Sequence, residues 1–225
     1  MDASRSTRRA RRARRCWITC QSRASSATRS LSSRRDGVAA VCLRRLRPRP
    51  FRRIPAASSS TRRPLALLGF MGSGKTLVGG LVAQRGRAQF FDLDHLVEDE
   101  AGMSVAEIFA THSEAAFRAF EKQTLPRLLQ PGAVVALGGG VVMDDDNWSL
   151  ISDKAMTVHL DVPFPVVWER IKNLGTRPLV ANRSASEVEE LYDLRRPRYE
   201  QAKHRVDGTR PAGDVADEVL QLWSA

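Results

Sequence analysis

The amino-acid sequence predicts an α/β fold, with a parallel sheet of about five strands and helices on both faces of that sheet. From residue 64 onward, short apolar runs alternate with amphipathic stretches that have a helical period. The run 133–137 is apolar throughout, as expected of a strand buried on both faces. A glycine-rich loop joins the first apolar run to the first amphipathic stretch. Strands that alternate with helices indicate a parallel sheet, whose ligands bind at the carboxyl ends of the strands.

The predicted elements follow one another along the chain. Strands are predicted at 65–68, 90–91, 133–137, 157–160 and around Val206. Helices are predicted where apolar residues recur every three or four positions, at 75–85, 96–100, 105–109, 117–128, 166–171, 188–194 and 215–222. The three acidic residues 144–146 form a charge run that could bind a cation, but we favour a solvated loop.

The charge divides the chain into two regions. Residues 1–63 hold 19 arginines against two acids, whereas residues 64–225 hold 17 basic and 23 acidic residues. All three cysteines lie in the first region. We therefore predict a basic, disordered segment at 1–63, followed by one domain at 64–225 that needs no disulfide bond. The chain has no run of 18 apolar residues, so no membrane-spanning helix is predicted.

A phosphate-binding motif occupies the loop after the first strand. Residues 69–76 read Gly-Phe-Met-Gly-Ser-Gly-Lys-Thr and fit the pattern G-x-x-x-x-G-K-[ST] between a strand and a helix. Backbone N–H groups and the helix N-terminus favour a phosphate here, Lys75 reaches the β- and γ-phosphates, and the Thr76 hydroxyl suits Mg²⁺. The residues predicted to contact the nucleotide are Gly72, Ser73, Gly74, Lys75, Thr76 and Leu77.

Further motifs follow the phosphate loop at a defined spacing. They are Phe91-Asp92-Leu93-Asp94, Glu114-x-x-Phe117-Arg118 with Glu121, Gly138-Gly139-Gly140, Arg177-Pro178-Leu179 and Arg195-x-Pro197-x-Tyr199. In this order they resemble the shikimate kinase family over nearly all of residues 64–207. The resemblance implies a P-loop NTPase fold like that of nucleoside monophosphate kinases, with a mobile lid at about 173–186. It also implies transfer of the γ-phosphoryl group of MgATP to the 3-hydroxyl of shikimate, in aromatic amino-acid biosynthesis.

The chemistry of this acceptor agrees with the side chains that the resemblance assigns to it. Arginine can bond a carboxylate in two places, so Arg118 and Arg195 are predicted to clamp the carboxylate of shikimate. Asp94 is predicted to bind the acceptor and to take or orient the proton of the attacking hydroxyl. An alternative or additional role for Asp94 is to cap the next helix. The glycines 138–140 allow the backbone to approach the ligand closely.

Other side chains are assigned to the nucleotide side. Asp92 resembles the residue that holds Mg²⁺ through water, although it could simply be a turn residue. Arg177, in the lid, is implied to stabilise phosphate charge during transfer. Arg170 is implied to stack on adenine, or else to cover its own helix with its stem. Glu121 lies three residues after Arg118 and is expected either to orient it by an ion pair or to form a solvated surface pair.

Two other functions stay open. One is a kinase for another small acceptor, such as gluconate or a nucleoside monophosphate; gluconate also carries a carboxylate and hydroxyls, so two arginines do not exclude it. The other is a nucleotide-dependent nucleic-acid-binding protein that uses the basic segment. The combined motifs favour shikimate and ATP as the partners of a monomer that binds neither membrane nor nucleic acid. The sequence departs from the family pattern at Gly80, Ser113 and Trp148. None of these positions belongs to the predicted phosphate, magnesium or carboxylate contacts, so we expect them to affect catalytic efficiency and stability more than function.

Three interpretations of residues 1–63 stay open. The Arg-rich, Ser-rich, acid-poor composition is typical of a transit peptide, which would direct the chain to a plastid. It could also be a tail for nucleic acid or an acidic partner. The third interpretation is translation from upstream of the true start. We favour the third, because the domain reads as complete from Pro64 and its motifs look more bacterial than plastid; the predicted location is then the cytoplasm.

Overall fold

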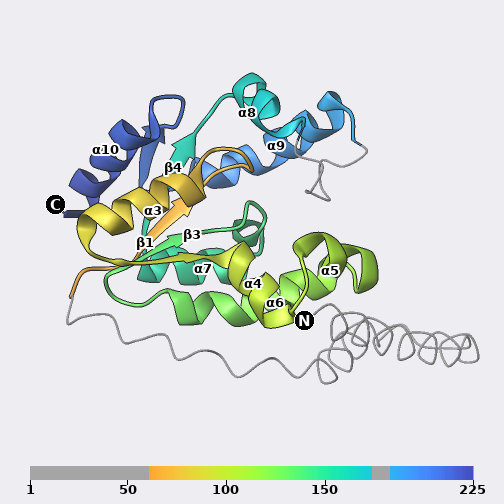
Figure 1. Ribbon diagram of the computed structural model, residues 1–225, viewed down its shortest axis with the longest axis horizontal. Coiled ribbons are helices and arrows are strands. Elements are labelled where there is room, and N and C mark those ends of the chain that lie inside the picture. Colours follow the sequence, from red (N-terminus) through yellow and green to blue (C-terminus); the bar gives the residue numbers. More distant parts are fainter. Residues whose placement is uncertain (1–60, 174–182, 225) are drawn as a thin grey trace, which may run out of the picture. The chain divides into compact units, whose positions relative to one another are not determined.

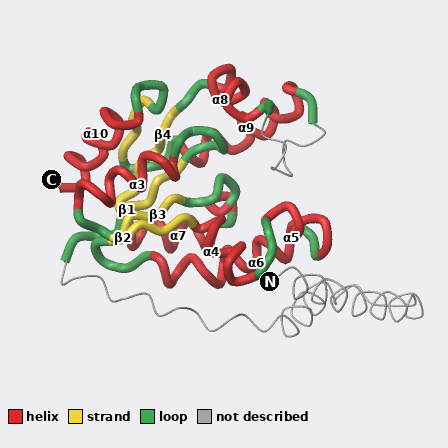
Figure 2. Tube along the Cα trace, in the orientation of Figure 1, coloured by secondary structure: helices red, strands yellow, loops and turns green. Residues whose placement is uncertain are grey.

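The computed structural model describes residues 61–173 and 183–224 as a five-stranded sheet with helices around it (Figures 1 and 2). The strands are β1 (Leu65–Leu68), β2 (Gln89–Asp92), β3 (Ala133–Ala136), β4 (Met156–Asp161) and β5 (His204–Asp207). Their order across the sheet is β2-β3-β1-β4-β5, and every neighbouring pair is parallel. The predicted α/β fold with a parallel sheet of five strands is therefore confirmed.

Helices connect these strands. They are α3 (Lys75–Gly86), α4 (Leu93–Ala101), α5 (Val105–Thr111), α6 (Glu114–Leu128), α7 (Asp145–Lys154), α8 (Phe164–Ile171), α9 (Ala185–Tyr199) and α10 (Ala212–Ser224), with a short 3₁₀ turn η1 at Val141–Met143. The acids 144–146 are exposed, as expected, but the prediction that they form a loop was wrong. Asp144 is the N-cap of α7 and accepts a hydrogen bond from the backbone N–H of Asn147. The following two acids lie in the first turn, where negative charge stabilises a helix.

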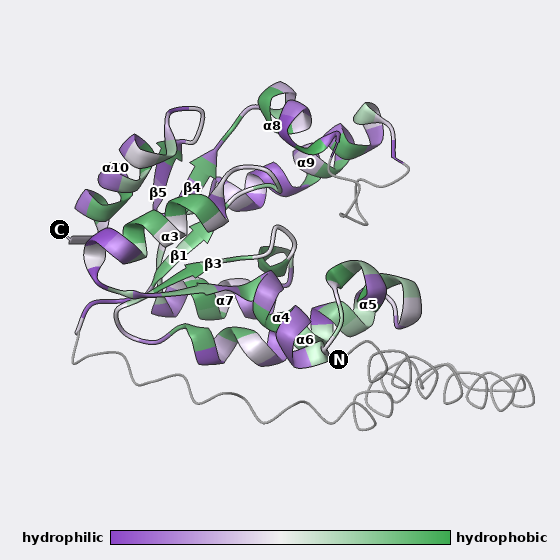
Figure 3. Ribbon diagram, in the orientation of Figure 1, coloured by the Kyte–Doolittle hydropathy of each residue, from purple (hydrophilic) through white to green (hydrophobic). Residues whose placement is uncertain are grey.

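Successive side chains of each strand point to opposite faces of the sheet. In β1, Leu65 and Leu67 pack into a core cluster with residues of α3 and α10, including Val82 and Val219. Figure 1 shows α3 and α10 together over this face, and Figure 3 shows hydrophobic residues along β1, β3 and β4. Since α7 contacts β4 and α6 but does not contribute to this cluster, helices cover both faces, as predicted.

The domain includes residues that precede Pro64. The backbone carbonyl of Arg63 accepts a hydrogen bond of 2.8 Å from the indole Nε1 of Trp223, a buried residue of α10. The guanidinium of Arg62 lies 4.7 Å from the centre of the Trp223 ring, and its carbonyl accepts a 2.7 Å bond from the Gly132 N–H. These contacts join the segment before β1 to the last helix and to the start of β3.

We expect a chain of residues 61–225 to be more stable than one of residues 64–225. The shorter chain leaves the Trp223 indole N–H without its acceptor and removes the cation–π contact, at a combined cost of about 2 kcal/mol. For a domain of this size, the cost corresponds to a thermal midpoint lower by about 5 °C. Calorimetry of the two chains tests this, with Trp223→Phe in both lengths as the control. The difference in thermal midpoint between the two lengths should shrink when both carry Trp223→Phe. Equal midpoints for the two chains with Trp223 would contradict the inclusion of residues 61–63 in the domain.

Candidate active site

The phosphate loop lies between the carboxyl end of β1 and the start of α3. Gly74 is the N-cap of α3 and has a φ of 93°, a left-handed conformation that glycine adopts without strain. Because Gly74 has no side chain, none of its own atoms covers the first N–H groups of α3. The loop therefore offers a helix N-terminus to an anion, as the sequence motif predicts.

Lys75 and Thr76 begin this helix. The Lys75 ammonium donates hydrogen bonds to the carbonyl oxygens of Gly69 and Phe70, at 2.9 and 2.8 Å, so it lies over the phosphate loop. The Thr76 hydroxyl donates a 2.7 Å hydrogen bond to Oδ2 of Asp92, at the end of β2. The structure thus brings together the two residues that were predicted to hold Mg²⁺.

The donor set at Thr76 and Asp92 suits Mg²⁺. A hydroxyl and a carboxylate are hard oxygen ligands, and Mg²⁺ commonly takes only one or two of these from protein, its other ligands being phosphates and water. Within the described residues there is no cluster of three or more His, Cys, Asp or Glu side chains that could cage a metal ion. The pair fits a cation that arrives together with a phosphate ligand.

Asp92, not Asp94, caps the helix that follows β2. Its Oδ1 accepts hydrogen bonds from the backbone N–H groups of Asp94, at 3.1 Å, and His95, at 3.4 Å. The alternative role of Asp94 as the N-cap was therefore wrong. Asp92 is more than a turn residue, because it caps α4 and also accepts the hydrogen bond from Thr76. With the cap provided by Asp92, the Asp94 side chain is directed instead into a cavity.

That cavity has a volume of about 410 Å³ and lies between α4, α5, α6, α9 and the glycine triplet. The predicted acceptor residues that line it are Asp94, Arg118, Gly139, Gly140 and Arg195. Its apolar lining comes from Met71, Val105, Ala106, Phe109 and Phe117, which the sequence did not single out as ligand contacts. The helical period of Phe109 and Phe117 signalled only an apolar face, and their place beside Asp94 depends on how α5 and α6 pack.

The glycine triplet allows charged side chains to pack against the backbone. A Cβ atom at Gly138 would lie 2.5 Å from Oδ1 of Asp94 and 2.7 Å from Oε1 of Glu121. A Cβ atom at Gly140 would overlap the guanidinium of Arg118. The atoms that approach these glycines closely are side chains of the cavity, and Gly138 itself is not among the cavity's lining residues. The predicted approach of the glycine backbone to a ligand stays a prediction.

Glu121 and Arg118 form an ion pair inside the protein. Glu121 is fully buried, and its Oε2 lies 2.6 Å from Nη1 of Arg118, whose second nitrogen contacts Glu114 at 3.0 Å. The alternative of a solvated surface pair was wrong. Burial raises the pKa of Glu121 to about 7, against the lowering effect of Arg118. Burial alone would lower the pKa of Arg118, but the neighbouring Glu121 and Glu114 raise it.

The buried carboxyl of Glu121 gives the protein a pH-dependent stability. Its folded-state pKa of about 7 lies above the ordinary value of 4.5, so the folded state binds more protons between these pH values. Relative to Glu121→Gln, the free energy of unfolding should be highest below pH 4.5 and fall as the pH rises to 7, by up to about 3 kcal/mol. Urea titrations of both proteins between pH 4.5 and 8 measure the difference.

Glu107→Gln is the matched control for this titration. The Ser104 backbone and hydroxyl lower the pKa of Glu107, so its contribution is lost only as the pH falls below 4.5. Its difference from the unchanged protein should stay level between pH 5 and 8. A level difference for Glu121→Gln as well would contradict the assignment of the raised pKa.

Arg170 and Arg177 are both predicted to contact the nucleotide, and only Arg170 lies within the described residues. Arg170 donates hydrogen bonds to the carbonyl oxygens of Gly72, at 3.2 Å, and Gly208, at 3.3 Å. It therefore joins the phosphate loop to the turn after β5, on the predicted nucleotide side. Arg177 and most of the expected lid, 174–182, lie outside the described residues.

The three departures from the family pattern have different structural consequences. Ser113 has a φ of 126°, a backbone conformation that favours glycine, and its hydroxyl accepts a hydrogen bond from the Ala116 N–H at the start of α6. The guanidinium of Arg198 lies over the ring of Trp148, 5.6 Å from the ring centre. A Cβ atom at Gly80 would meet no other atom within 4 Å. None of the three lines the cavity.

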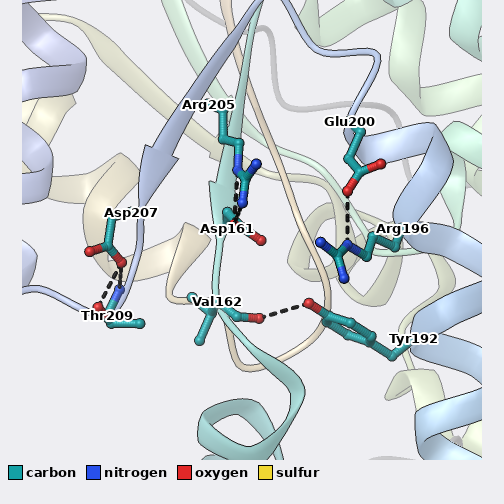
Figure 4. Close-up of polar contacts among 8 residues, drawn as sticks. All are labelled: Asp161, Val162, Tyr192, Arg196, Glu200, Arg205, Asp207 and Thr209. Atoms are coloured by element: carbon teal, nitrogen blue, oxygen red, sulfur yellow. Dashed lines mark hydrogen bonds and ion pairs between the residues drawn. The ribbon is translucent and has the colours of Figure 1, made fainter.

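A second hollow, of about 540 Å³, is lined by none of the predicted residues, although Gly208, between two of its lining residues, accepts a hydrogen bond from Arg170. It is lined by Asp161, Pro163, Arg205, Asp207 and Thr209, at the ends of β4 and β5. Figure 4 shows the polar contacts of four of these residues, Asp161, Arg205, Asp207 and Thr209. Its polar groups bond to one another: Arg205 pairs with Asp161, and both the N–H and the hydroxyl of Thr209 donate to Asp207. The smaller cavity is the candidate active site, because the unlike charges of Asp94, Arg118 and Arg195 converge there.

Comparisons with known proteins identify the family to which the chain is similar. The family model described as Shikimate kinase matches residues 71–223. The shikimate kinase of Aromatoleum aromaticum is 42% identical over 156 residues, covering 67% of this chain and 89% of the relative. That of Aquifex aeolicus is 35% identical over 155 residues, covering 68% and 92%.

The solved structures give the same result. The shikimate kinase of Acinetobacter baumannii, in complex with shikimate, matches with a TM-score of 0.70 and 29% identity, over 72% of this chain and 93% of its own. A deoxyadenosine kinase from M. mycoides with bound dATP matches with a TM-score of 0.51 at 11% identity, which shows a shared fold alone. None of the described helices is long and apolar enough to cross a membrane.

Proposed function

This chain belongs to the shikimate kinase family of ATP-dependent phosphotransferases, and we propose on that premise how its residues perform the reaction. The γ-phosphoryl group of MgATP passes to the 3-hydroxyl of shikimate, which is bound in the cavity of about 410 Å³. One observation carries the proposal: two arginines and one aspartate converge in a cavity beside the phosphate loop. These are the groups that a ring with one carboxylate and several hydroxyls requires.

The carboxylate of shikimate binds between Arg118 and Arg195. Arg195 is buried, with 6% of its surface exposed, and its guanidinium lies 5.9 Å from the centre of the Phe70 ring. Arg118 is held by Glu121 and Glu114, so its orientation is set before the acceptor arrives. Two partly desolvated guanidinium groups bind an anion more strongly than exposed ones, because water screens them less.

Asp94 acts on the acceptor hydroxyl. The hydroxyl oxygen forms a bond to the γ-phosphorus while the bond from that phosphorus to the bridging oxygen of ADP breaks. The hydroxyl proton passes to the Asp94 carboxylate, which also orients the oxygen for in-line attack. Its position at the second residue of α4, capped by Asp92, fixes this carboxylate relative to the phosphate loop.

The nucleotide phosphates bind at the N-terminus of α3. The backbone of Gly72–Gly74 and the Lys75 ammonium stabilise the charge on the β- and γ-phosphates. Thr76 and Asp92 hold Mg²⁺, which when bound neutralises charge on the phosphate oxygens. Arg170 borders the adenine side, and Arg177 adds a positive charge when the lid closes.

An acceptor comparison tests the proposed function. ATP consumption by residues 61–225 is measured with shikimate, gluconate and a nucleoside monophosphate as separate acceptors. We expect turnover with shikimate and background rates with the other two, because neither matches the spacing of two arginines and Asp94. Turnover with gluconate or the nucleotide in place of shikimate would retain the phosphate site and contradict the assigned acceptor.

A further inference from the structure

Tyr199 lies beside two predicted acceptor contacts, although it does not line the cavity. It lies four residues after Arg195 in α9, so both side chains are on one face of the helix. Its ring is almost completely buried, with 1% of its surface exposed. The phenol hydroxyl donates a hydrogen bond of 2.5 Å to the carbonyl oxygen of Gly139. The guanidinium of Arg195 lies on the same side of Gly139: its Nη1 and the phenol oxygen would both lie 3.4 Å from a Cβ atom at that glycine.

The surroundings of Tyr199 keep its hydroxyl protonated, so that it can donate a hydrogen bond. Burial raises the pKa of Tyr199 to about 12, against the lowering effect of Arg195, so the hydroxyl keeps its proton at neutral pH. A protonated phenol can donate to Gly139 and accept from Arg195 at the same time. The contact would change if the phenol ionised, because an ion would accept from both sides and leave the carbonyl of Gly139 without a donor.

His159 supports the other side of the ring. This residue of β4 is buried, and its ring centre lies 5.5 Å from that of Tyr199, with the planes at 36°. Burial lowers the pKa of His159 to about 4, so the imidazole is neutral at pH 7. The Tyr199 ring is therefore held between the sheet and α9 by a neutral aromatic neighbour that adds no charge beside Arg195.

We propose that Tyr199 is a positioning residue for the acceptor: its hydroxyl fixes the guanidinium of Arg195 and the Gly139 carbonyl in one arrangement. This inference rests on the proposed function, because it assumes that Arg195 binds the carboxylate of shikimate. A guanidinium has five N–H donors in a rigid fork, and only some orientations present two of them to a carboxylate. A bond to Tyr199 uses one donor and thereby selects the direction in which the others point.

Replacing Tyr199 by phenylalanine removes only the hydroxyl. The carbonyl of Gly139 then loses its donor, and one N–H of Arg195 loses its proposed acceptor, in a region where water does not replace them. We expect the KM for shikimate to rise about tenfold or more, while kcat and the KM for ATP stay within about twofold. Tyr199 does not line the cavity, so a change confined to acceptor binding distinguishes positioning from general loss of structure.

Tyr192→Phe is the matched control. Tyr192 is the other tyrosine of the chain, lies on the same helix and is also buried. Its hydroxyl donates a 3.1 Å hydrogen bond to the carbonyl of Val162, away from the cavity (Figure 4). This variant loses an equivalent bond, so it reports the effect on stability alone. We expect a similar drop in thermal midpoint for both variants and a raised KM for shikimate only in Tyr199→Phe.

A double-variant cycle provides the second measurement. If Tyr199 acts through Arg195, the effect of Tyr199→Phe on the KM for shikimate should largely disappear when Arg195 is already lysine. Independent effects, or equal KM values for Tyr199→Phe and Tyr192→Phe, would overturn the inference. Failure of the proposed function would be seen separately, as the absence of shikimate-dependent turnover in the unchanged protein.

Discussion

Replacing Lys75 by methionine is expected to lower kcat about 10²- to 10³-fold, the effect of removing one fixed charge from a phosphate-transfer site. The Lys75 ammonium lies over the phosphate loop, bonded to the carbonyl oxygens of Gly69 and Phe70. From there it can reach the β- and γ-phosphates as negative charge moves to the bridging oxygen of ADP. Methionine keeps the length of the side chain and the helix propensity, so the start of α3 should persist.

Steady-state rates with saturating shikimate and ATP measure this change. Lys122→Met is the control, because the Lys122 ammonium pairs with Asp144 and Asp146 on the surface, outside the cavity. Its kcat should stay within about twofold of the unchanged protein. A Lys75→Met protein with the same kcat as Lys122→Met would contradict the placement of the phosphates at the N-terminus of α3.

The second large effect is expected from Arg118→Ala. This change removes a charged hydrogen-bonding partner of the shikimate carboxylate, a loss of about 2–4 kcal/mol that raises the KM for shikimate about 30- to 1,000-fold. The KM for ATP should change little, because Arg118 is on α6 and the phosphate loop precedes α3. Separate titrations of shikimate and ATP measure the two constants, and an equal loss for both would contradict the carboxylate clamp.

Two further variants separate acceptor binding from folding. Arg127→Ala removes another arginine of α6, one that pairs with Glu100 at 2.9 Å and does not line the cavity, and it should leave both KM values unchanged. In Arg118→Ala the buried Glu121 loses its ion pair, which lowers stability as well. Combining Arg118→Met with Glu121→Gln removes both charges. The weak binding of shikimate should persist in this double variant even if its thermal midpoint recovers.

Strands β1 and β3 could be predicted because each is a short run of apolar residues, whereas β5 has only one apolar residue, Val206. The bounds of β1, 65–68, were predicted correctly, and β3 ends one residue before the predicted limit. The helix α7 was missed because its sequence, Asp145–Lys154, is mostly polar and buries only two residues, Asn147 and Ile151. A helix with so few buried residues has little apolar period for sequence analysis to detect.

The residues of the candidate site could be proposed from motifs in the sequence, but their packing could not. The motif positions Asp94, Arg118 and Arg195 line one cavity, although they lie on three different helices. Whether Glu121 is exposed depends on what covers α6, and the cap at Asp92 depends on where β2 ends. Neither property is encoded in local spacing. The bond between Tyr199 and Gly139 joins residues 60 positions apart, so only the folded chain brings them together.

The most direct test of the whole account is the identity of the product that residues 61–225 form from ATP and shikimate. Phosphorus and proton magnetic resonance of the reaction mixture assigns the phosphate to one hydroxyl of the ring. We predict one ADP for each phosphorylated ring, with the phosphorus coupled to the proton on carbon 3. Release of ADP without a phosphorylated ring, or phosphate on another hydroxyl, would contradict the proposed arrangement of Asp94, the arginines and the phosphate loop.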